Sequence, residues 1–344
     1  MSATARQASL FADAPLKADG KAGGLRAPFP AFGGKSGIAA LVWHAFGDAK
    51  QYIEPFMFSG AVLLANPRGP ASLEVAGDIN GYVANFWRAV KCQPDRAWQE
   101  ADYPVSHIDL AARHRWLVEP DRVAALAAQL ADPAWPGDAR IAGWWAWGQC
   151  CWIGSGWCEP PREGKIPHVS SAGRGIQAQG QIPHVSSAGM GIQAQGQIPH
   201  VSDAGRGAQS PTDGELLTPY QGRAREWIRA LSVRLARVRL IHGEWTRCLN
   251  HHYGGANTAI FLDPPYRSFE ALYGPQRPVA EAVAEWCREH QSEAKIALCG
   301  HAGDYDLPAW EVVAWDRGRL TYGGAKTTAS EAIWFSPTCR RINR

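Results

Sequence analysis

The sequence TAIFLDPPY, residues 258–266, joins a strand to a stiff turn. Residues 258–262 are nearly all apolar, which is typical of a strand covered on both faces of a parallel sheet. Asp263 follows at once, and the carboxyl ends of parallel strands line the ligand crevice of such a sheet. Two prolines stiffen the turn and fix the directions of its carbonyl groups. An acid, a rigid carbonyl and the ring of Tyr266 suit the amino edge of a flat nucleobase. The alternative is a proline turn in which Asp263 only caps the strand.

Strands and helices alternate on both sides of this segment, which indicates a doubly wound α/β fold. Strands are expected at 51–56, 73–77, 238–243, 258–263, 295–299, 311–315 and 331–335. Helices are expected at 59–65, 80–90, 223–239 and 280–290. We therefore predict one catalytic domain made of 26–95 and 222–344, split by an insertion at 96–221.

Composition narrows the class of protein. The chain has 344 residues, of which 46% are hydrophobic and 19% charged, so it can bury a core and is not disordered throughout. The chain has no run of 18 apolar residues, so no membrane span is expected. Residues 1–25 lack the pattern of a secretory signal and are expected to form a flexible tail. Eight cysteines without a CxxC pair favour reduced thiols, a cytoplasmic location and no metal site.

The insertion differs in character from the rest of the chain. Residues 144–157 are rich in tryptophan, and we expect a packed hairpin there in preference to a base-stacking platform. Cys150, Cys151 and Cys158 are expected to be small core residues. Three nearly identical 16-residue repeats follow at 165–212. Their glycines and prolines exclude a long helix and favour short hairpins or extended loops. One histidine recurs in each copy, but no acid or cysteine recurs with it, so a metal site is disfavoured.

Three further motifs make the pattern specific. FPAFGGK occupies residues 29–35 ahead of the first strand, EPFMFSG occupies 54–60 after it, and DIN at 78–80 ends the second strand. With DPPY after the insertion, this order resembles the Dam-like DNA adenine-N6 methyltransferases, particularly the phage and prophage type. The resemblance covers about 27–100 and 235–340. It implies a Rossmann-like S-adenosylmethionine-dependent methyltransferase fold with an inserted target-recognition domain.

The resemblance also implies a cofactor site for S-adenosylmethionine. Asp78 would hydrogen-bond the ribose hydroxyl groups, as acids do in other nucleotide crevices. Lys35 would reach the methionine carboxylate, and Glu54 would lie beside the sulfonium and ammonium groups. Phe56 would pack against the cofactor, and Asp263 would lie at the boundary between cofactor and target.

The same resemblance assigns the catalytic loop, which is Asp263, Pro264, Pro265 and Tyr266. Asp263 and the carbonyl of Pro264 would hold the target amine, while Tyr266 stacks on an adenine flipped out of the duplex. Flipping costs a few kcal/mol, which stacking offsets by roughly 1–3 kcal/mol. Methyl transfer would then be a direct displacement that depends on alignment.

Two positions depart from the family pattern. Phe58 stands where the first glycine of the F-x-G-x-G turn is usual, and Ala31 stands where an aromatic residue usually precedes FGGK. Phe58 could fill the space that Ala31 leaves, or the pair could mark a damaged pocket with weak or no activity.

Double-stranded DNA is the partner that the resemblance implies. Arginine forks match phosphates well, and the candidates for DNA contact are Arg174 and Arg206 in the repeats and Arg223 and Arg225 beyond them. The repeats could read base edges, or could be a linker duplicated without consequence. A palindromic target would suit a homodimer, and a restriction-modification role would add an endonuclease partner. The alternatives are an adenine methyltransferase acting on RNA, or a DNA-binding protein that kept the fold and lost catalysis.

Overall fold

A computed structural model gives the fold of most of the chain. It describes residues 25–31, 34–103, 105–152, 157–158, 168–169, 176–177, 219–249, 255–266, 279–315 and 331–342. For 168–169, 176–177, 219–223 and 315 the description covers the backbone alone.

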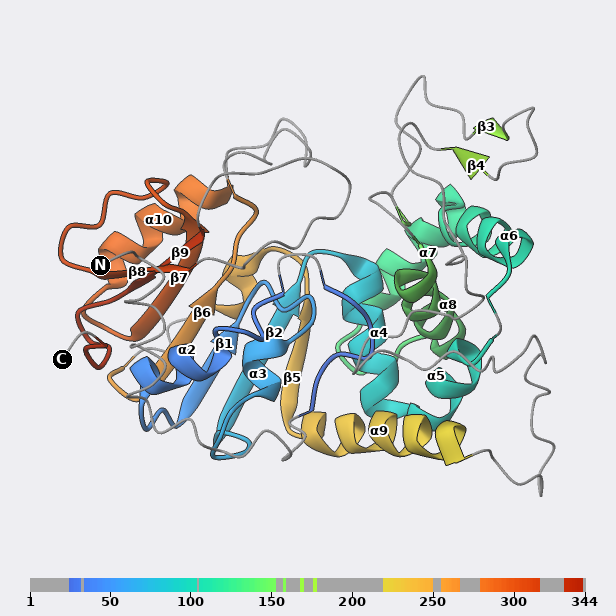
Figure 1. Cartoon of the computed structure of the whole chain (residues 1–344), viewed down its shortest axis with the longest axis horizontal. Coiled ribbons are helices and arrows are strands. Elements are labelled where there is room, and N and C mark those ends of the chain that lie inside the picture. Colours follow the sequence, from blue (N-terminus) through green and yellow to red (C-terminus); the bar gives the residue numbers. More distant parts are fainter. Residues whose placement is uncertain are drawn as a thin grey trace, which may run out of the picture.

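Seven strands of the described chain form one mixed sheet (Figure 1). They are β1 Gln51–Glu54, β2 Leu73–Asp78, β5 Val238–His242, β6 Thr258–Leu262, β7 Lys295–His301, β8 Glu311–Trp315 and β9 Glu331–Phe335. The spatial order is β5-β2-β1-β6-β7-β9-β8, and β9 is antiparallel to both neighbours. The α/β class and all seven expected strands are thus confirmed.

The chain reverses its direction of travel across the sheet at β1. From β1 it moves outward through β2 to β5, then returns to place β6 on the other side of β1. β1 is parallel to both β2 and β6. This is the switch point of a doubly wound sheet, and folds of this kind bind their ligands there, beyond the carboxyl ends of the strands. Glu54 ends β1, Asp78 ends β2, and Asp263 follows β6.

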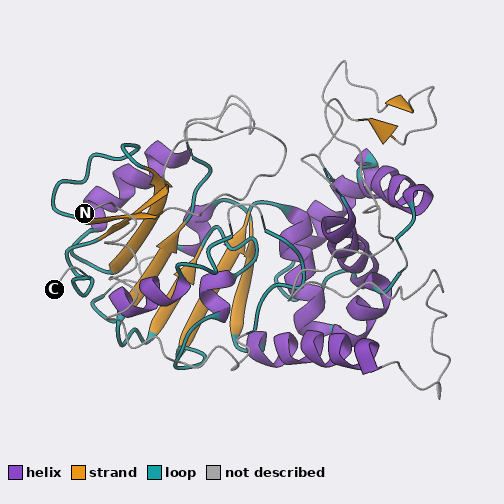
Figure 2. Ribbon diagram, viewed as in Figure 1, coloured by secondary structure: helices purple, strands orange, loops and turns teal. Residues whose placement is uncertain are grey.

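Helices cover both faces of the sheet (Figure 2). They are α2 Ala39–Phe46, α3 Ala61–Leu64, α4 Gly81–Cys92, α5 Pro94–Ala101, α6 His107–Leu117, α7 Pro120–Leu130, α8 Ala139–Cys151, α9 Pro219–Leu235 and α10 Val279–His290, with a 3₁₀ helix η1 at Trp245–Cys248. One apolar cluster joins α2, α3, α4 and α9 to one face, and a second joins η1 and α10 to the other. None of these described helices is long and apolar enough to cross a bilayer.

Helices α5–α8 lie beyond the β5 edge and pack on α4 and α9 (Figure 1). The apolar core continues into them without a break. Phe29 contacts both Phe86 of α4, at 5.2 Å between ring centroids, and Trp145 of α8, at 4.9 Å. Helices α5–α8 therefore share one core with the sheet and do not enclose a core of their own.

Residues 144–151 of the tryptophan-rich segment lie in helix α8, and the expectation of a hairpin there was wrong. Asp138 caps α8 by accepting a hydrogen bond from the backbone N–H of Ile141. The glycines of this helix permit close packing. A Cβ atom on Gly143 would lie 2.5 Å from the backbone carbonyl carbon of Glu100, so glycine allows α8 to approach α5. Cys150 and Cys151 are buried, as expected.

The repeats enter the described structure only as two short strands in the first copy. β3 His168–Val169 and β4 Ile176–Gln177 pair antiparallel, which matches a short hairpin. The other two copies lie outside the described residues, as does the expected tail at 1–24.

Candidate functional site

Asp263 brings together two of the predicted site residues. Its Oδ2 atom forms an ion pair with Lys35 Nζ at 2.8 Å, and its Oδ1 atom accepts a hydrogen bond from the Tyr266 hydroxyl at 3.3 Å. The Lys35 side chain is only 6% exposed, whereas that of Asp263 is 22% exposed. Burial alone lowers the pKa of Lys35, but Asp263, Cys299 and Glu331 outweigh it and raise that pKa above its usual value. The pair is thus a largely shielded ion pair that opens to solvent on the Asp263 side.

Tyr266 is held from two sides. The Lys35 ammonium lies 5.3 Å from the centre of its ring, and the His301 ring meets it edge-on at 4.7 Å between centroids. His301 ends β7, the parallel neighbour of β6, so the sheet itself places the imidazole beside the DPPY turn.

The two prolines account for the course of the turn. Pro264 and Pro265 have no backbone N–H, so neither can continue the ladder between β6 and its neighbours. The chain leaves the sheet there, and Tyr266 folds back over Asp263 three residues later.

Glu54 lies at the floor of the site and is 2% exposed. Its Oε2 atom accepts hydrogen bonds from the Tyr52 hydroxyl at 2.9 Å and the Leu63 backbone N–H at 3.1 Å. The carboxyl group therefore fastens the first turn of α3 to β1. Burial raises the pKa of Glu54 to about 8, against the opposing effect of these two hydrogen bonds.

Asp78 lies at the same level of the sheet as Asp263, on the opposite side of β1. Glu54 is in register with Ala76, and Ile53 with Ile260. Asp78 lies two residues beyond Ala76 and Asp263 three residues beyond Ile260, so both acids lie two residues beyond the level of Glu54. Two interstrand spacings separate them, which is about 10 Å. Asp78 accepts hydrogen bonds from the backbone N–H groups of Phe58 and Asn80. Burial raises its pKa to about 6, although both hydrogen bonds oppose the rise.

Phe58 takes a glycine-like conformation, with φ 31°. The backbone at this turn thus follows the course that the missing glycine would favour. Its ring points toward the helices, 5.7 Å from that of Phe29 and 6.4 Å from that of Trp145. These two rings are its aromatic neighbours, and the idea that Phe58 fills space left by Ala31 stays a prediction. The Ala31 carbonyl accepts a hydrogen bond from the Gly34 N–H in the turn before Lys35.

Phe56 packs against a residue that sequence reasoning missed. Its ring stacks on Trp245 of η1 at 6.4 Å, and Trp245 meets Trp286 of α10 edge-on. Trp245 follows β5 closely, so a search of every strand end would have found it.

A scan of family models finds no match. A search of curated proteins likewise finds none with significant similarity. The assignment of chemistry to this site therefore depends on its motifs and its geometry.

The predicted DNA contacts are only partly visible. Arg174 and Arg206 lie outside the described residues, and Arg223 is described only in its backbone, within α9. Arg225 forms an ion pair with Asp95 at 2.9 Å, and Arg229 binds the same carboxylate. Internal pairing therefore accounts for Arg225 in the free protein, and its contact with DNA stays a prediction.

The described residues hold no group of three histidine, cysteine or acidic side chains that could bind a metal ion. The polar groups at the crevice are a lysine, three separate carboxyl groups and aromatic rings, which suit an organic ligand with hydroxyl, amine and ring parts.

Proposed function

We propose that the protein is a site-specific DNA adenine-N6 methyltransferase that uses S-adenosylmethionine. The observation that carries the proposal is the contact of Lys35, Asp263 and Tyr266 at the switch point of a doubly wound sheet. Residues 228 positions apart in the sequence, from two motifs of the family pattern, meet in one ion pair.

The residues on the β2 side fit the cofactor. A carboxylate offers roughly four lone-pair directions, and Asp78 uses one on each oxygen for the backbone, so both oxygens can accept further hydrogen bonds from ribose hydroxyl groups. Phe56, half-buried against Trp245, offers one ring face beside it. When bound, S-adenosylmethionine supplies an electrophilic methyl group.

The residues on the β6 side fit the target amine. Asp263 and the Pro264 carbonyl would each accept one N–H of the amine, which keeps its nitrogen directed at the methyl donor. Tyr266 would stack on the flipped base, with its ring fixed by His301. In the free protein the Lys35 ammonium is paired with the Asp263 carboxylate. We expect this ammonium to shift toward the methionine carboxylate when S-adenosylmethionine and the target base bind.

Transfer of tritiated methyl groups tests the proposal. Purified protein should label duplex DNA but not an RNA of the same sequence, and Asp263→Ala should abolish labelling. Labelling of RNA alone would indicate the RNA methyltransferase. No labelling and no thermal shift with S-adenosylhomocysteine would indicate a binding protein without catalysis. Methylation-aware sequencing of DNA from expressing cells would then give the base and its recognition sequence.

A further inference from the structure

An acid and an imidazole lie opposite one another at the end of β7, and the motif pattern assigns a role to neither. In the register of β7 and β9, His301 lies directly opposite Glu331. Directly opposed residues of an antiparallel pair have Cβ atoms about 4.5–5.5 Å apart. Both side chains are half-buried. The Glu331 carboxylate is therefore within reach of the His301 ring.

Alternation along the strands places this pair on the face of the sheet that α2 covers. Side chains two residues apart in a strand share a face. His301 lies two residues after Cys299, and Glu331 lies two residues before Ile333. Cys299 and Ile333 both belong to the apolar cluster on the α2 side. His301 and Glu331 thus project on that side, where Lys35 precedes α2.

The electrostatics of Lys35 place Glu331 near the same group of residues. The Lys35 ammonium pairs with Asp263 at 2.8 Å and lies 5.3 Å from the centre of the Tyr266 ring. Burial lowers the pKa of Lys35, but attraction to Asp263, Cys299 and Glu331 raises it further than burial lowers it. The charge of Glu331 is thus close to the contacts around Tyr266.

The Tyr266 ring depends on His301 for its orientation. Its hydroxyl donates a hydrogen bond to Asp263 at 3.3 Å, which holds the far end of the ring but not its rotation about the axis through that oxygen. The His301 ring meets it edge-on, with 4.7 Å between centroids and 71° between planes. Edge-on contacts between rings are directional. A turn of the imidazole would therefore turn the phenol ring with it.

The backbone of His301 is fixed, but its ring needs a further partner. The His301 N–H donates to Asp304 Oδ2 at 2.7 Å, and the Asp304 N–H donates to the His301 carbonyl at 3.0 Å. These bonds hold the main chain of the turn. A carboxylate that accepts the imidazole N–H fixes the tautomer and the orientation of the ring. Glu331 is in register to supply that carboxylate.

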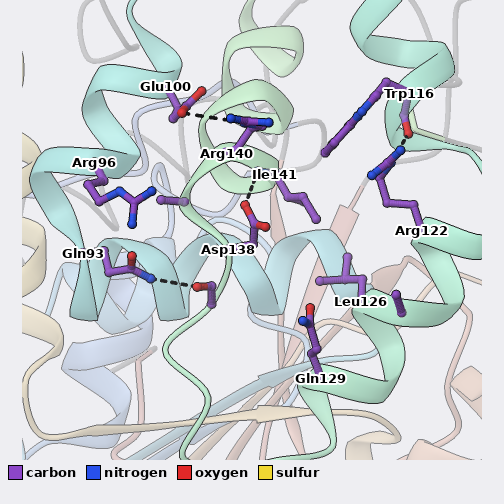
Figure 3. A pocket seen from close by; sticks show the side chains of 13 residues that line it. Gln93, Arg96, Glu100, Trp116, Arg122, Leu126, Gln129, Asp138, Arg140 and Ile141 are labelled. Carbon is purple, nitrogen blue, oxygen red and sulfur yellow. Dashed lines mark hydrogen bonds and ion pairs between the residues drawn. The ribbon is translucent and has the colours of Figure 1, made fainter.

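The polar hollow between α5, α7 and the start of α8 is separate from this group (Figure 3). Its volume is about 420 Å³. Two of the arginines that line it are paired with acids of the chain, Arg122 with Glu119 at 2.6 Å and Arg140 with Glu100 at 3.9 Å. The group around Tyr266 is instead built from the edge of the sheet and the segment before α2.

We propose that Glu331 is a positioning residue, which orients the His301 imidazole and through it the Tyr266 ring. The inference rests on the proposed function for the ligand of that ring, a base flipped out of DNA. It extends the support of the DPPY turn to β9, which lies two strands away from β6 in the sheet.

Fluorine NMR of protein labelled with 3-fluorotyrosine tests the orientation in the free protein. The chain has nine tyrosines, and Tyr266→Phe identifies the resonance of Tyr266. Glu331→Ala and His301→Ala should each shift this resonance, and Glu331→Ala should add no shift in a His301→Ala background. Glu289→Ala is the control, because Glu289 is exposed in α10 near the start of β7, and it should leave the resonance in place.

Methyl transfer to duplex DNA tests the consequence for the reaction. Tyr266 would contact only the flipped base, so Glu331→Ala should lower kcat roughly 10-fold and change the affinity for the duplex by less than about 2-fold. Glu331→Gln keeps the volume of the side chain and removes its charge. It replaces the alanine variant in both measurements if that variant melts below the assay temperature, and it should act in the same direction.

The outcomes separate this inference from the proposed function. A Tyr266 resonance that Glu331→Ala leaves in place, or shifts equally with and without His301, would overturn the positioning role even if the protein methylates DNA. A shift that depends on His301, in a protein without methyl transfer, would support the positioning of the ring and overturn the proposed function. An unchanged kcat in Glu331→Ala would overturn the link between this positioning and the target base.

Discussion

Lys35 and Asp263 depend on one another for stability as well as for any chemistry. Removal of one partner leaves the other charge shielded from water without its ion pair, which destabilises a protein more than loss of an exposed pair does. Because Lys35 is the more buried of the two, the larger penalty follows when Lys35 loses Asp263.

We therefore expect Asp263→Asn to lower the free energy of unfolding by about 1–3 kcal/mol, in addition to abolishing methyl transfer. Lys35→Met should restore much of that stability when combined with it, because no charge then remains buried. Chemical denaturation of the two single variants and the double variant measures this. Additive losses in the double variant would contradict the coupling.

Glu54 should make stability depend on pH. Its pKa is raised to about 8, so the folded chain holds a proton that the unfolded chain releases above its ordinary value of 4.5. The free energy of unfolding should therefore fall as the pH rises toward 8, by up to about 1.4 kcal/mol per pH unit. Glu54→Gln should flatten this dependence between about pH 6 and pH 8. This range lies above the pKa of Asp78, which is raised to about 6.

Denaturation of wild type and variant across this range checks the expectation. Glu244→Gln, at an exposed residue, should give a curve parallel to that of the wild type. Parallel curves for Glu54→Gln and the wild type would show that Glu54 does not titrate there.

In the turn between β1 and α3, Phe58 combines a strained backbone conformation with close packing of its ring. Phe58→Ala should lower the free energy of unfolding because the contacts with Phe29 and Trp145 are lost. Phe58→Gly loses the same ring but relieves the positive φ, so it should be more stable than Phe58→Ala by about 1 kcal/mol.

The order should reverse in an ordinary helix, which provides the control. Val233 is an exposed residue of α9, and Gly there should be less stable than Ala by roughly 1 kcal/mol. Melting curves of the four variants give both differences. If Phe58→Gly proves no better than Phe58→Ala, the backbone conformation at this turn carries no strain.

Helix α9 is fixed to the sheet by a buried ion pair. Arg234 donates two hydrogen bonds to the Glu74 carboxylate, at 2.6 and 2.8 Å, and a third to the Leu63 carbonyl. Arg234→Leu leaves Glu74 buried and unpaired, and should lower the free energy of unfolding by about 3–5 kcal/mol.

Arg229 is the matched control on the same helix. It pairs with Asp95 in an ion pair whose side chains are 49% and 41% exposed, so Arg229→Leu should change stability by less than about 1 kcal/mol. Urea denaturation of both variants measures the contrast. Equal losses in the free energy of unfolding would mean that the burial of the Arg234–Glu74 pair does not increase its contribution to stability.

Strands were easier to predict than the insertion because their pattern is local. TAIFL at 258–262 and the acid after it identify a buried strand and its end without reference to other segments. Helix α8 could not be recognised in this way, since its glycines are explained only by neighbours from other segments: α5 beside Gly143 and Trp157 beside Gly148. The arginines of α9 likewise acquire their partners, Asp95 and Glu74, only in the folded chain.

At the scale of the molecule, the motifs predicted which residues would meet but not how. Lys35 and Asp263 were both assigned to the site, yet their direct ion pair depends on the path of the chain before α2. That path is set by packing of Phe29 between α4 and α8, which no local pattern reveals.

The shared core predicts a single unfolding transition. Phe86 and Trp145 lie in one apolar cluster with residues of the sheet, so the helices beyond β5 should not melt separately. Far-UV circular dichroism and tryptophan fluorescence should give coincident melting curves. Trp145→Leu should shift both curves to lower temperature together; two resolved steps would show independent units.

The continuous core also bears on attempts to exchange the helices beyond β5. A chimera that exchanged only α5–α8 would cut through the rings of Phe29, Phe86 and Trp145 and leave mismatched surfaces on both sides. A workable graft would have to carry the Phe29 segment and the outer face of α4 along with the transplanted helices.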